Sequence, residues 1–362
     1  MAPVDKTVTD NSRGLYILAN DVVFDQLIAL INSIERNIGT NMPICIVPYD
    51  NRVEKAKLAT KEYPQVQWFE DEAILEKWED FARRIWRSHP TAFDTWAKKG
   101  IEGVNRMGMH RRFCCFDGPF DQFVYLDADI LVMNSFDLLF DSLDQHDFVT
   151  YDYQYKDLSH VFDVNSARLE DVFKRVGASE AMPDLAMASS GKNRLETEIF
   201  CAGLYASKKG LFTDQMISDL LTQLEAGESE ILYFNGPDQS ILNYMVMKSG
   251  VDAINLSCQL PEEKRTGCCV TSNHFSEKEQ VLFDKGERLT YLHYIGISSK
   301  FFGQICSGQK VLFPYCHLFL YYRYLKEDAI PALTGPTLWY NEPPKIPLRQ
   351  RVFRKIQQML SS

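Results

Sequence analysis

Two aspartates, Asp127 and Asp129, follow the apolar run FVYL at residues 123–126. Side chains two residues apart lie on the same side of an extended chain, so both carboxylates can reach one ion. Without a counter-charge the two carboxylates would repel and raise each other's pKa. A divalent cation removes that cost, and Mn²⁺ or Mg²⁺ on such hard oxygen ligands can carry a diphosphate and neutralise a leaving group. The pair therefore predicts a metal site where a buried strand ends.

Two other interpretations of Asp-x-Asp stay open on the residues alone. Either aspartate could form a helix N-cap or a turn. The stretch YLDADILV also resembles the nucleophile strand of haloacid-dehalogenase-type phosphatases, where the first aspartate would be phosphorylated and the second would act as acid and base. In that superfamily the motif lies at the first strand, whereas here at least three strands are expected before it, and Leu131 stands where Thr or Val is usual.

The chain before the aspartates predicts a layered α/β fold. Expected strands lie at 14–20, 43–50 and 66–70, with helices at 21–37 and about 51–63. This β-α-β-α-β order predicts a parallel sheet with helices on both faces. Ligands of such sheets bind beyond the carboxyl ends of the strands, which places Ala19–Asp21 and Tyr49–Asp50 near the crevice.

The later chain predicts further strands and a helix that would contribute to the site. Expected strands lie at 122–129, 147–153, 198–210 and 288–300, with helices over 72–118 and at 237–250. The helix at 237–250 opens on proline and closes on glycine, which are typical boundary residues. Between 154 and 197 the pattern loosens, which predicts an insertion that shapes the acceptor side.

Composition limits the class of protein. A formal net charge of -10 and a pI near 5.3 argue against a nucleic-acid binder, which would present a basic face. No apolar stretch approaches the roughly 18 residues of a membrane span, and the first residues lack a signal-peptide core. The nine cysteines show no paired metal-ligand spacing, so we expect reduced thiols in a cytoplasmic protein.

Three further stretches follow Asp-x-Asp in order: FCAGLYASK (200–208), PDQSILN (237–243) and LHYIGISSK (292–300). Together with it they resemble the retaining glycosyltransferases of family 8, such as glycogenin and the bacterial galactosyl- and glucosyltransferases, over residues 13–303. The resemblance implies a GT-A fold, a Rossmann-like mixed α/β sheet flanked by helices. It also implies transfer of a hexosyl unit from a nucleotide-sugar, usually a UDP-sugar, with Mn²⁺ or Mg²⁺.

The family's metal ligands are the two aspartates and a late histidine, which implies Asp127, Asp129 and His293. Standing alone, His293 would more often be a core histidine. The family continues His-x-x-Gly-x-x-Lys toward the phosphates; Gly296 matches, and lysine arrives one residue late, at Lys300. A glycine lets the backbone approach a phosphate and a lysine adds a point charge, although Lys300 could also be a solvated surface residue.

The resemblance of PDQSILN implies that Asp238 and Gln239 lie under the reacting sugar. A side chain there could stabilise an oxocarbenium-like centre or attack it. Asp238 could also be a first-turn acid favoured by the helix dipole. Ala128 and Gly203 are implied donor contacts. Cys201 replaces the family's Asn, and no base is assigned that would make its thiol a nucleophile.

The stretch ILANDVVF resembles the family's Ala-x-Asp-x-x-Tyr, which cradles the nucleobase, and implies Ala19, Asn20 and Asp21 as counterparts. Asp21 could equally be only the cap of the helix that follows. The family's aromatic residue is either Phe24, displaced, or absent.

Basic residues in RMGMHRRF, before the aspartates, are similar to a donor-binding Arg or Lys of the family. Arg106, Arg111 and Arg112 compete for that role, and spacing does not choose among them because DGPF (117–120) could be an insertion. We take Arg112 as the expected donor contact.

Residues 304–362 lie beyond the resemblance and form an expected helical C-terminal extension. Its end, 345–362, carries five Lys or Arg and no acid, with an apolar stripe at helical spacing. Such a basic amphipathic helix can lie on the inner face of an anionic membrane or pack on the domain. The sequence does not identify the acceptor, which could be a saccharide, lipid or protein.

Two rival functions remain at this stage. A nucleotidyltransferase would share the layered fold, but ANDVVFDQ has neither the Gly-rich first loop nor the following Lys expected of one. A catalytically degenerate nucleotide-sugar-binding protein is supported by the departures at Cys201 and Lys300.

Overall fold

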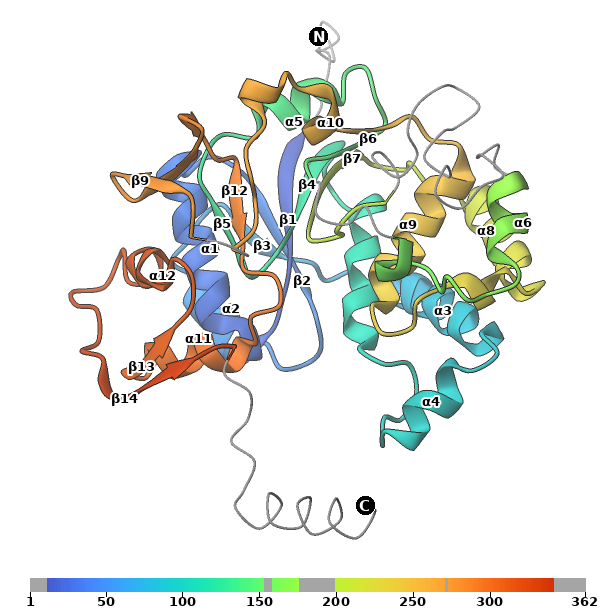
Figure 1. The fold of residues 1–362 in the computed structure, drawn as a ribbon, viewed down its shortest axis with the longest axis horizontal. Coiled ribbons are helices and arrows are strands. Elements are labelled where there is room, and N and C mark those ends of the chain that lie inside the picture. Colours follow the sequence, from blue (N-terminus) through green and yellow to red (C-terminus); the bar gives the residue numbers. More distant parts are fainter. Residues whose placement is uncertain (1–11, 153–157, 176–198, 271–272, 342–362) are drawn as a thin grey trace, which may run out of the picture.

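The structure of the chain is a computed structural model that describes residues 12–152, 158–175, 199–270 and 273–341. In this described part a central sheet has the strand order β3-β2-β1-β4-β7-β6-β8 (Figure 1). Its strands are β1 (Arg13–Ala19), β2 (Ile44–Pro48), β3 (Val66–Trp68), β4 (Gln122–Asp127), β6 (Phe148–Thr150), β7 (Leu204–Lys208) and β8 (Ala253–Asn255). The predicted mixed α/β sheet flanked by helices is confirmed.

The direction of the strands decides which residues meet at the sheet edge. β1 runs parallel to β2 and β4, and β2 runs parallel to β3, as the β-α-β-α-β order predicts. β7 then runs antiparallel to β4 and β6. Because β7 is reversed, its first residue lies opposite the end of β4, with Leu204 paired to Leu126. The residues just before β7 and the two aspartates after Leu126 therefore share one edge.

The two faces of the sheet carry different cores because successive strand side chains point to opposite sides. Tyr16, Tyr125 and Tyr205 pack with α3, α8, α9 and the 3-10 segment η2. Ile17 and Leu126 pack with α1, α2 and α5 on the other face. These elements are α1 (Phe24–Asn37), α2 (Glu54–Thr60), α3 (Glu72–Ser88), η2 (Met107–Phe116), α5 (Asp137–Ser142), α8 (Asp214–Glu225) and α9 (Pro237–Ser249). Figure 1 shows the two helical layers on opposite sides of β1 and β4.

A third hydrophobic cluster covers the outer side of α1. Here α12 (Cys316–Arg323) packs on α1, and α11 (Ser299–Cys306) packs on β13 (Gln309–Leu312). β13 pairs with β14 (Thr334–Trp339). The expected boundary at 303 falls inside α11, and the chain from there to β14 continues this layer.

The remaining described elements lie around this framework. They are η1 (Asp21–Val23), α4 (Ala92–Lys98), β5 (Ile130–Val132), η3 (Leu158–His160), α6 (Leu169–Arg175), η5 (Glu228–Ile231), α10 (Leu256–Gln259), η6 (Glu262–Lys264), β9 (Ser276–Lys278), β10 (Val281–Asp284), β11 (Glu287–Arg288) and β12 (Tyr291–His293). Much of the expected 154–197 insertion and all of the 345–362 segment lie outside the described residues. Within the described ranges, no helix combines the length and apolarity needed to cross a membrane.

The contact between α12 and α1 yields a stability prediction. Asn32 of α1 is buried; its Nδ2 donates to the Tyr322 carbonyl at 2.8 Å, and its Oδ1 accepts from the Tyr63 hydroxyl at 2.8 Å. Asn32→Ala removes the hydrogen-bond partner of the Tyr322 carbonyl and of the Tyr63 hydroxyl. The free energy of unfolding should therefore fall by about 1–3 kcal/mol for each lost bond. Urea unfolding measures the loss, and the exposed Asn51→Ala should change stability by less than about 0.5 kcal/mol. Equal effects of the two substitutions would contradict this packing.

Candidate metal and sugar-nucleotide site

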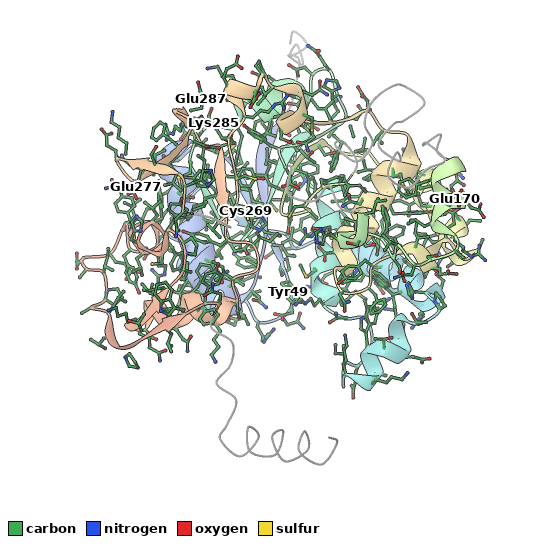
Figure 2. All side chains as sticks on the ribbon, viewed as in Figure 1. Tyr49, Glu170, Cys269, Glu277, Lys285 and Glu287 are labelled. Carbon is green, nitrogen blue, oxygen red and sulfur yellow. The ribbon has the colours of Figure 1, made fainter. Side chains whose placement is uncertain are left out.

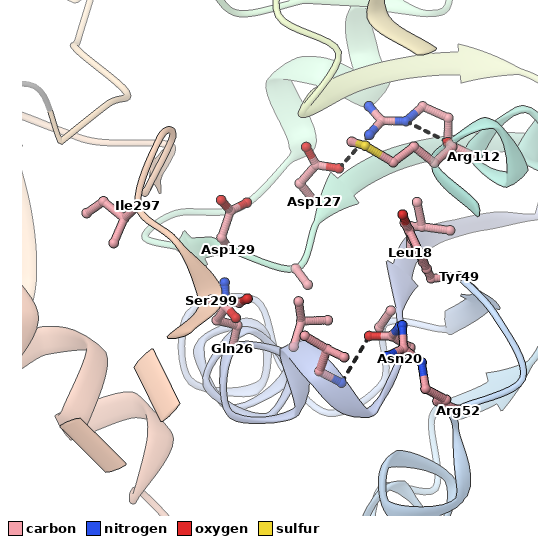
Figure 3. A pocket seen from close by; sticks show the side chains of 15 residues that line it. Leu18, Asn20, Gln26, Tyr49, Arg52, Arg112, Asp127, Asp129, Ile297 and Ser299 are labelled. Carbon is pink, nitrogen blue, oxygen red and sulfur yellow. Dashed lines mark hydrogen bonds and ion pairs between the residues drawn. The ribbon is translucent and has the colours of Figure 1, made fainter. Parts of the chain in front are cut away.

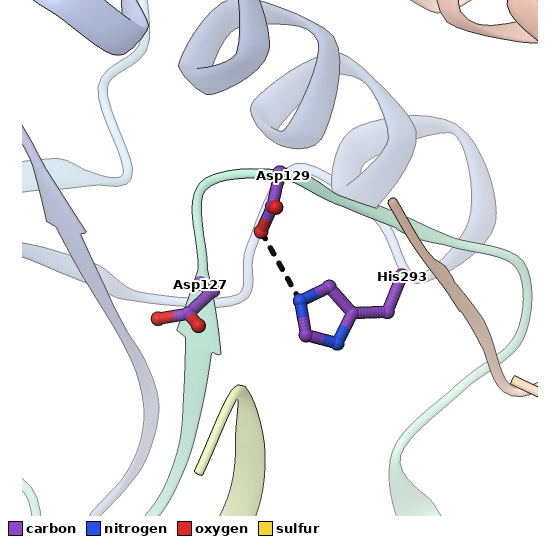
Figure 4. A group of neighbouring side chains, drawn as sticks. All are labelled: Asp127, Asp129 and His293. Atoms are coloured by element: carbon purple, nitrogen blue, oxygen red, sulfur yellow. Dashed lines mark ion pairs between the residues drawn. The ribbon is translucent and has the colours of Figure 1, made fainter. Parts of the chain in front are cut away.

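The three predicted metal ligands meet at the edge of the sheet. Asp127 is the last residue of β4, Asp129 lies in the turn before β5, and His293 ends β12. β12 pairs antiparallel with β5, which places His293 opposite Ile130. One ligand atom from each of the three side chains lies within 4.8 Å of the others. Figure 4 shows the imidazole beside both carboxylates, with Nε2 3.3 Å from Oδ1 of Asp129.

These donors fit a divalent cation such as Mn²⁺ or Mg²⁺, because two carboxylates and an imidazole are hard or borderline ligands. Burial lowers the pKa of His293, but the carboxylate of Asp129 outweighs it and raises that pKa well above its ordinary value. A cation would therefore replace the charge of a protonated His293. Asp127 accepts hydrogen bonds from Arg112 and Tyr125 through Oδ1, which leaves Oδ2 for a metal.

Arg112 is the buried positive charge of the site. Its side chain is 1% exposed, and Nη2 lies 3.1 Å from Oδ1 of Asp127 and 2.9 Å from Oδ2 of Asp238. Its Nη1 donates to the Ala202 carbonyl at 2.6 Å. Burial disfavours the charged guanidinium, but the two carboxylates outweigh it and raise the pKa of Arg112 well above its ordinary value. The guanidinium of Arg112 thus holds a predicted metal ligand and a predicted catalytic residue in a fixed relation.

The FCAG turn, residues 200–203, is fastened by α9. The Phe200 amide donates to Oδ1 of Asn243, and the Phe200 carbonyl accepts from Nδ2, each at 2.9 Å. The Ala202 amide donates to Oε1 of Gln239 at 3.2 Å. Polar residues of the predicted PDQSILN motif therefore hold the backbone of the predicted FCAG motif. This contact makes the two motifs one structural unit.

Gly203 and Cys201 lie against the metal ligands. The Gly203 carbonyl accepts from the Asp127 amide at 2.8 Å, and a Cβ on Gly203 would lie 2.4 Å from Cε1 of His293. This close approach of the imidazole explains why residue 203 is a glycine, since any side chain there would overlap the ring. Cys201 Sγ lies 4.0 Å from Nδ1 of His293, where it can orient the ring. Burial raises the pKa of Cys201 despite the lowering effect of His293, so the sulfur stays a thiol and is not an activated nucleophile.

Two cavities meet at the aspartates. The first cavity has a volume of about 350 Å³ and is shown in Figure 3. Its lining includes Leu18, Ala19, Asn20, Val22, Gln26, Tyr49, Arg52, Ala128, Ile297 and Ser299. The second cavity has a volume of about 430 Å³. Its lining includes Arg106, His160, Cys201, Gly203, Tyr233, Asn235, Asp238, Gln239, His293 and Gly296. Both are lined by Met109, Arg112, Asp127 and Asp129, so the metal ligands stand at their junction.

The structure separates the predicted nucleobase residues. Ala19 and Asn20 line the first cavity, but Asp21 does not. The Asp21 carboxylate instead accepts from the amides of Lys55 and Ala56, at 3.3 and 2.9 Å, and so caps α2. Asn20, not Asp21, caps the helical turn that follows, by accepting from the Val22 amide. Two first-turn amides of α2 without intrahelical partners explain why the carboxylate turns there.

Two of the three competing arginines are placed away from the first cavity. Arg111 donates to Oε1 of Glu79 at 2.7 Å and to the Pro48 carbonyl at 2.9 Å, and it lines neither cavity. Arg106 lines the second cavity alone. Lys300 is exposed and lines neither cavity, whereas its neighbour Ser299 lines the first.

Several lining residues were missed as site residues. Phe24 is buried under the ammonium of Lys55 and lines neither cavity, so the aromatic ring of the first cavity is that of Tyr49, just after β2. The strand-end rule had marked Tyr49–Asp50, and Figure 2 shows Tyr49 near the middle of the molecule. Burial raises the pKa of Tyr49, so its hydroxyl stays protonated. Tyr233 and Asn235 were missed because only a turn before α9 signals them.

The comparisons with known proteins concern solved structures alone. No protein-family model matches the chain, and no curated protein matches it. The chain is similar to apo WbbM, a bifunctional glycosyltransferase, at 15% identity and a TM-score of 0.48, over 98% of this chain and 53% of WbbM. It thus spans about half the length of that protein.

Two further solved structures are similar. Mouse xyloside xylosyltransferase 1 is 12% identical over 65% of this chain and 82% of that one, with a TM-score of 0.41. The galactosyltransferase LgtC, in complex with donor and acceptor sugar analogues, is 15% identical over 78% of this chain and 87% of that one, with a TM-score of 0.44.

Arg112→Met should lower the free energy of unfolding by about 3–5 kcal/mol, because the buried Asp238 and the partly buried Asp127 lose their counter-charge. Burial already raises the pKa of Asp127, and Arg112 opposes that rise. Its removal should move the folded-state pKa further above the unfolded value. The penalty is then largest above that pKa and shrinks as pH falls through it.

Urea unfolding of Arg112→Met and the native chain between about pH 7 and pH 5 measures this effect. Arg84 forms a surface ion pair with Glu225 at 2.9 Å, and Arg84→Met should cost about 0–1 kcal/mol. A pH-independent loss for Arg112→Met, no larger than for Arg84→Met, would show that the buried bridge does not form.

Gly203→Ala should displace the His293 ring and weaken Mn²⁺ binding about 10–100-fold, as lost support of a metal ligand does. Electron paramagnetic resonance titration of free Mn²⁺ measures this affinity. Gly303→Ala is the matched control, because a Cβ there meets nothing within 4 Å. Unchanged Mn²⁺ affinity in folded Gly203→Ala would contradict the placement of His293 as a ligand.

Proposed function

We propose that the chain is a metal-dependent glycosyltransferase with a GT-A fold, related to the retaining family 8 enzymes. It transfers a hexosyl unit from a UDP-sugar to an acceptor. The observation that carries this proposal is the convergence of Asp127, Asp129 and His293 at the junction of two cavities. A metal site between two pockets suits a substrate whose diphosphate separates a nucleoside from a sugar.

The first cavity is proposed to take the nucleoside. Its polar residues are preorganised: Asn20 Nδ2 donates to Oδ2 of Asp50 at 3.0 Å, and Arg52 forms an ion pair with the same oxygen. Burial would raise the pKa of Asp50, but the bonds from Arg52 and Asn20 outweigh it and lower that pKa. The ring of Tyr49 supplies an aromatic surface for a base, and Ala128 and Ser299 lie on the path to the metal ligands.

The metal ligands and Arg112 are proposed to stabilise the departing diphosphate. Asp127, Asp129 and His293 would hold Mn²⁺ or Mg²⁺, which supplies positive charge to the leaving group when bound. Arg112 is proposed to orient Asp127 through the ion pair between its Nη2 and Oδ1 of that residue. Because its guanidinium already binds two carboxylates, we assign it to positioning the site and not to direct phosphate contact.

Asp238 and Gln239 are the proposed catalytic residues, and both line the second cavity. Gln239 uses Oε1 to hold the FCAG turn, so its Nε2 can donate to a sugar or acceptor oxygen. The Asp238 carboxylate, partnered by Arg112, can stabilise positive charge at the anomeric carbon. The bond from that carbon to the diphosphate oxygen breaks, the acceptor oxygen forms the new glycosidic bond with retained configuration, and the acceptor's hydroxyl proton passes to the departing diphosphate.

The phosphatase alternative has less support from the site. Its nucleophile would be Asp127, whose Oδ1 already accepts from Arg112 and Tyr125. The binding-protein alternative rests on Cys201 and Lys300. Lys300 lines neither cavity, so its shifted position leaves the metal ligands intact.

Asp129→Asn tests the proposal. With Mn²⁺ and UDP at about 100 times the Kd, the native chain should gain about 2.7 kcal/mol of stability in a thermal-shift assay, and the variant should lose the metal-dependent part. Hydrolysis of the UDP-sugar without acceptor should fall by about 10²–10³, since the leaving group loses its electrostatic support.

Asp94→Asn, an exposed substitution in α4, is the matched control and should change neither result. Equal binding of UDP with and without Mn²⁺, or no binding of any nucleotide-sugar, would rule out the proposal. Phosphate release from a simple phosphate ester that is lost in Asp127→Asn would favour the phosphatase instead.

A further inference from the structure

Arg106 has an unusual backbone conformation beside the second cavity. Its φ and ψ are 52° and 43°, in the left-handed region that side chains with a Cβ rarely adopt. Two residues later, Gly108 packs against the chain just after β2 so closely that a Cβ would lie 2.1 Å from the Tyr49 carbonyl oxygen. The start of η2, which Arg106 precedes, therefore packs directly on Tyr49 of the first cavity. Such strained residues persist where the surrounding structure imposes them and cluster at ligand sites.

The guanidinium of Arg106 is uncommitted. Arg106 is exposed and lines the second cavity. Its carbonyl accepts from the Met109 amide at 2.9 Å, but within the described residues its guanidinium makes no ion pair or hydrogen bond. Two other cationic side chains of this cavity are engaged: Arg112 with Asp127 and Asp238, and His293 with Asp129. Arg106 can therefore bind an added anion without breaking an existing contact.

The position of Arg106 places that anion on the sugar side of the junction. Arg106 lines the second cavity, with Asp238 and Gln239, and does not line the first. Arg106 lies near enough to the Tyr49 ring to lower the pKa of its hydroxyl, against the larger raising effect of burial. Arg106 therefore shares the second cavity with Asp238 and Gln239, which belong to the first turn of α9.

We infer that the second cavity receives a sugar that carries a carboxylate or a phosphate ester, and that Arg106 binds this anionic group. A planar guanidinium matches both anions with two parallel hydrogen bonds. The inference rests on the proposed function and specifies its substrate class. Either the donor sugar or the acceptor could bring the anion, and the two sources are separated below.

Isothermal titration of the full chain with Mn²⁺ tests this assignment in two comparisons. The donor comparison measures the Kd of UDP-glucuronate and the Kd of UDP-glucose. The acceptor comparison, made with saturating UDP, sets glucuronate and glucose 6-phosphate against glucose. In at least one comparison the charged ligand should bind tenfold or more tightly than the neutral one. This preference should disappear in Arg106→Gln, while the Kd for UDP with Mn²⁺ stays within twofold.

Arg87→Gln, an exposed arginine of α3 outside both cavities, is the control and should keep the preference. The inference is overturned if charged and neutral ligands bind equally in both comparisons, or if Arg106→Gln keeps the preference. It is also overturned if Arg106→Gln weakens UDP itself tenfold, which would place Arg106 on the diphosphate.

Failure of the proposed function gives a different pattern. If UDP does not bind but glucuronate or glucose 6-phosphate binds in an Arg106-dependent manner, the anionic site stands and the glycosyltransferase proposal falls. If neither nucleotides nor charged sugars bind, both are overturned.

Discussion

The buried guanidinium of Arg112 is the interaction on which the candidate site depends. It bridges Asp127 on β4 and Asp238 on α9, and it also donates to the Ala202 carbonyl in the turn before β7. The buried carboxylate of Asp238 would be costly without a counter-charge, the partly exposed carboxylate of Asp127 less so, and a lone buried guanidinium would be costly as well. Each charge therefore requires the others. This mutual requirement fixes the sheet, the α9 helix and the FCAG turn in one arrangement.

The topology of the sheet explains how distant motifs reach that arrangement. The reversal of β7 brings residues 200–203 to the edge where β4 ends, and the pairing of β12 with β5 brings His293 there as well. Gln239 and Asn243 then hold the FCAG backbone from α9. Gly203 lies close enough to His293 that a larger residue would displace the imidazole. Support of the ligand from behind is what a metal site needs for a fixed geometry.

The sequence predicted the parts of the site whose chemistry is visible in residue type. Two carboxylates after an apolar strand indicate a cation, and alternating strands and helices indicate a layered fold. It could not choose among Arg106, Arg111 and Arg112, because burial and partners decide that choice and neither follows from spacing. The position of the Asp21 carboxylate illustrates the same limit. A cap acts on the nearest unsatisfied amides in space, and those belong to α2, which lies more than 30 residues away.

The direction of β7 was another feature that the sequence did not predict. The sequence predicts a strand at 198–210, of which the structure has 204–208, but it does not predict the orientation, and orientation decides which end of β7 meets the aspartates. The aromatic ring of the first cavity came from the strand-end rule and not from the ILANDVVF motif, since Tyr49 lines the cavity and Phe24 does not. When tertiary contacts determine the role of a residue, the local sequence pattern does not predict that role.

The central claim is that Asp127, Asp129 and His293 jointly hold a divalent cation between two substrate cavities. Anomalous diffraction at the manganese edge, from crystals grown with Mn²⁺ and UDP, tests it most directly. The account predicts one strong anomalous peak bonded to all three side chains, with the uridine in the cavity beside Asn20 and Tyr49. A peak elsewhere, or UDP bound at this junction with no metal on the three residues, would contradict it.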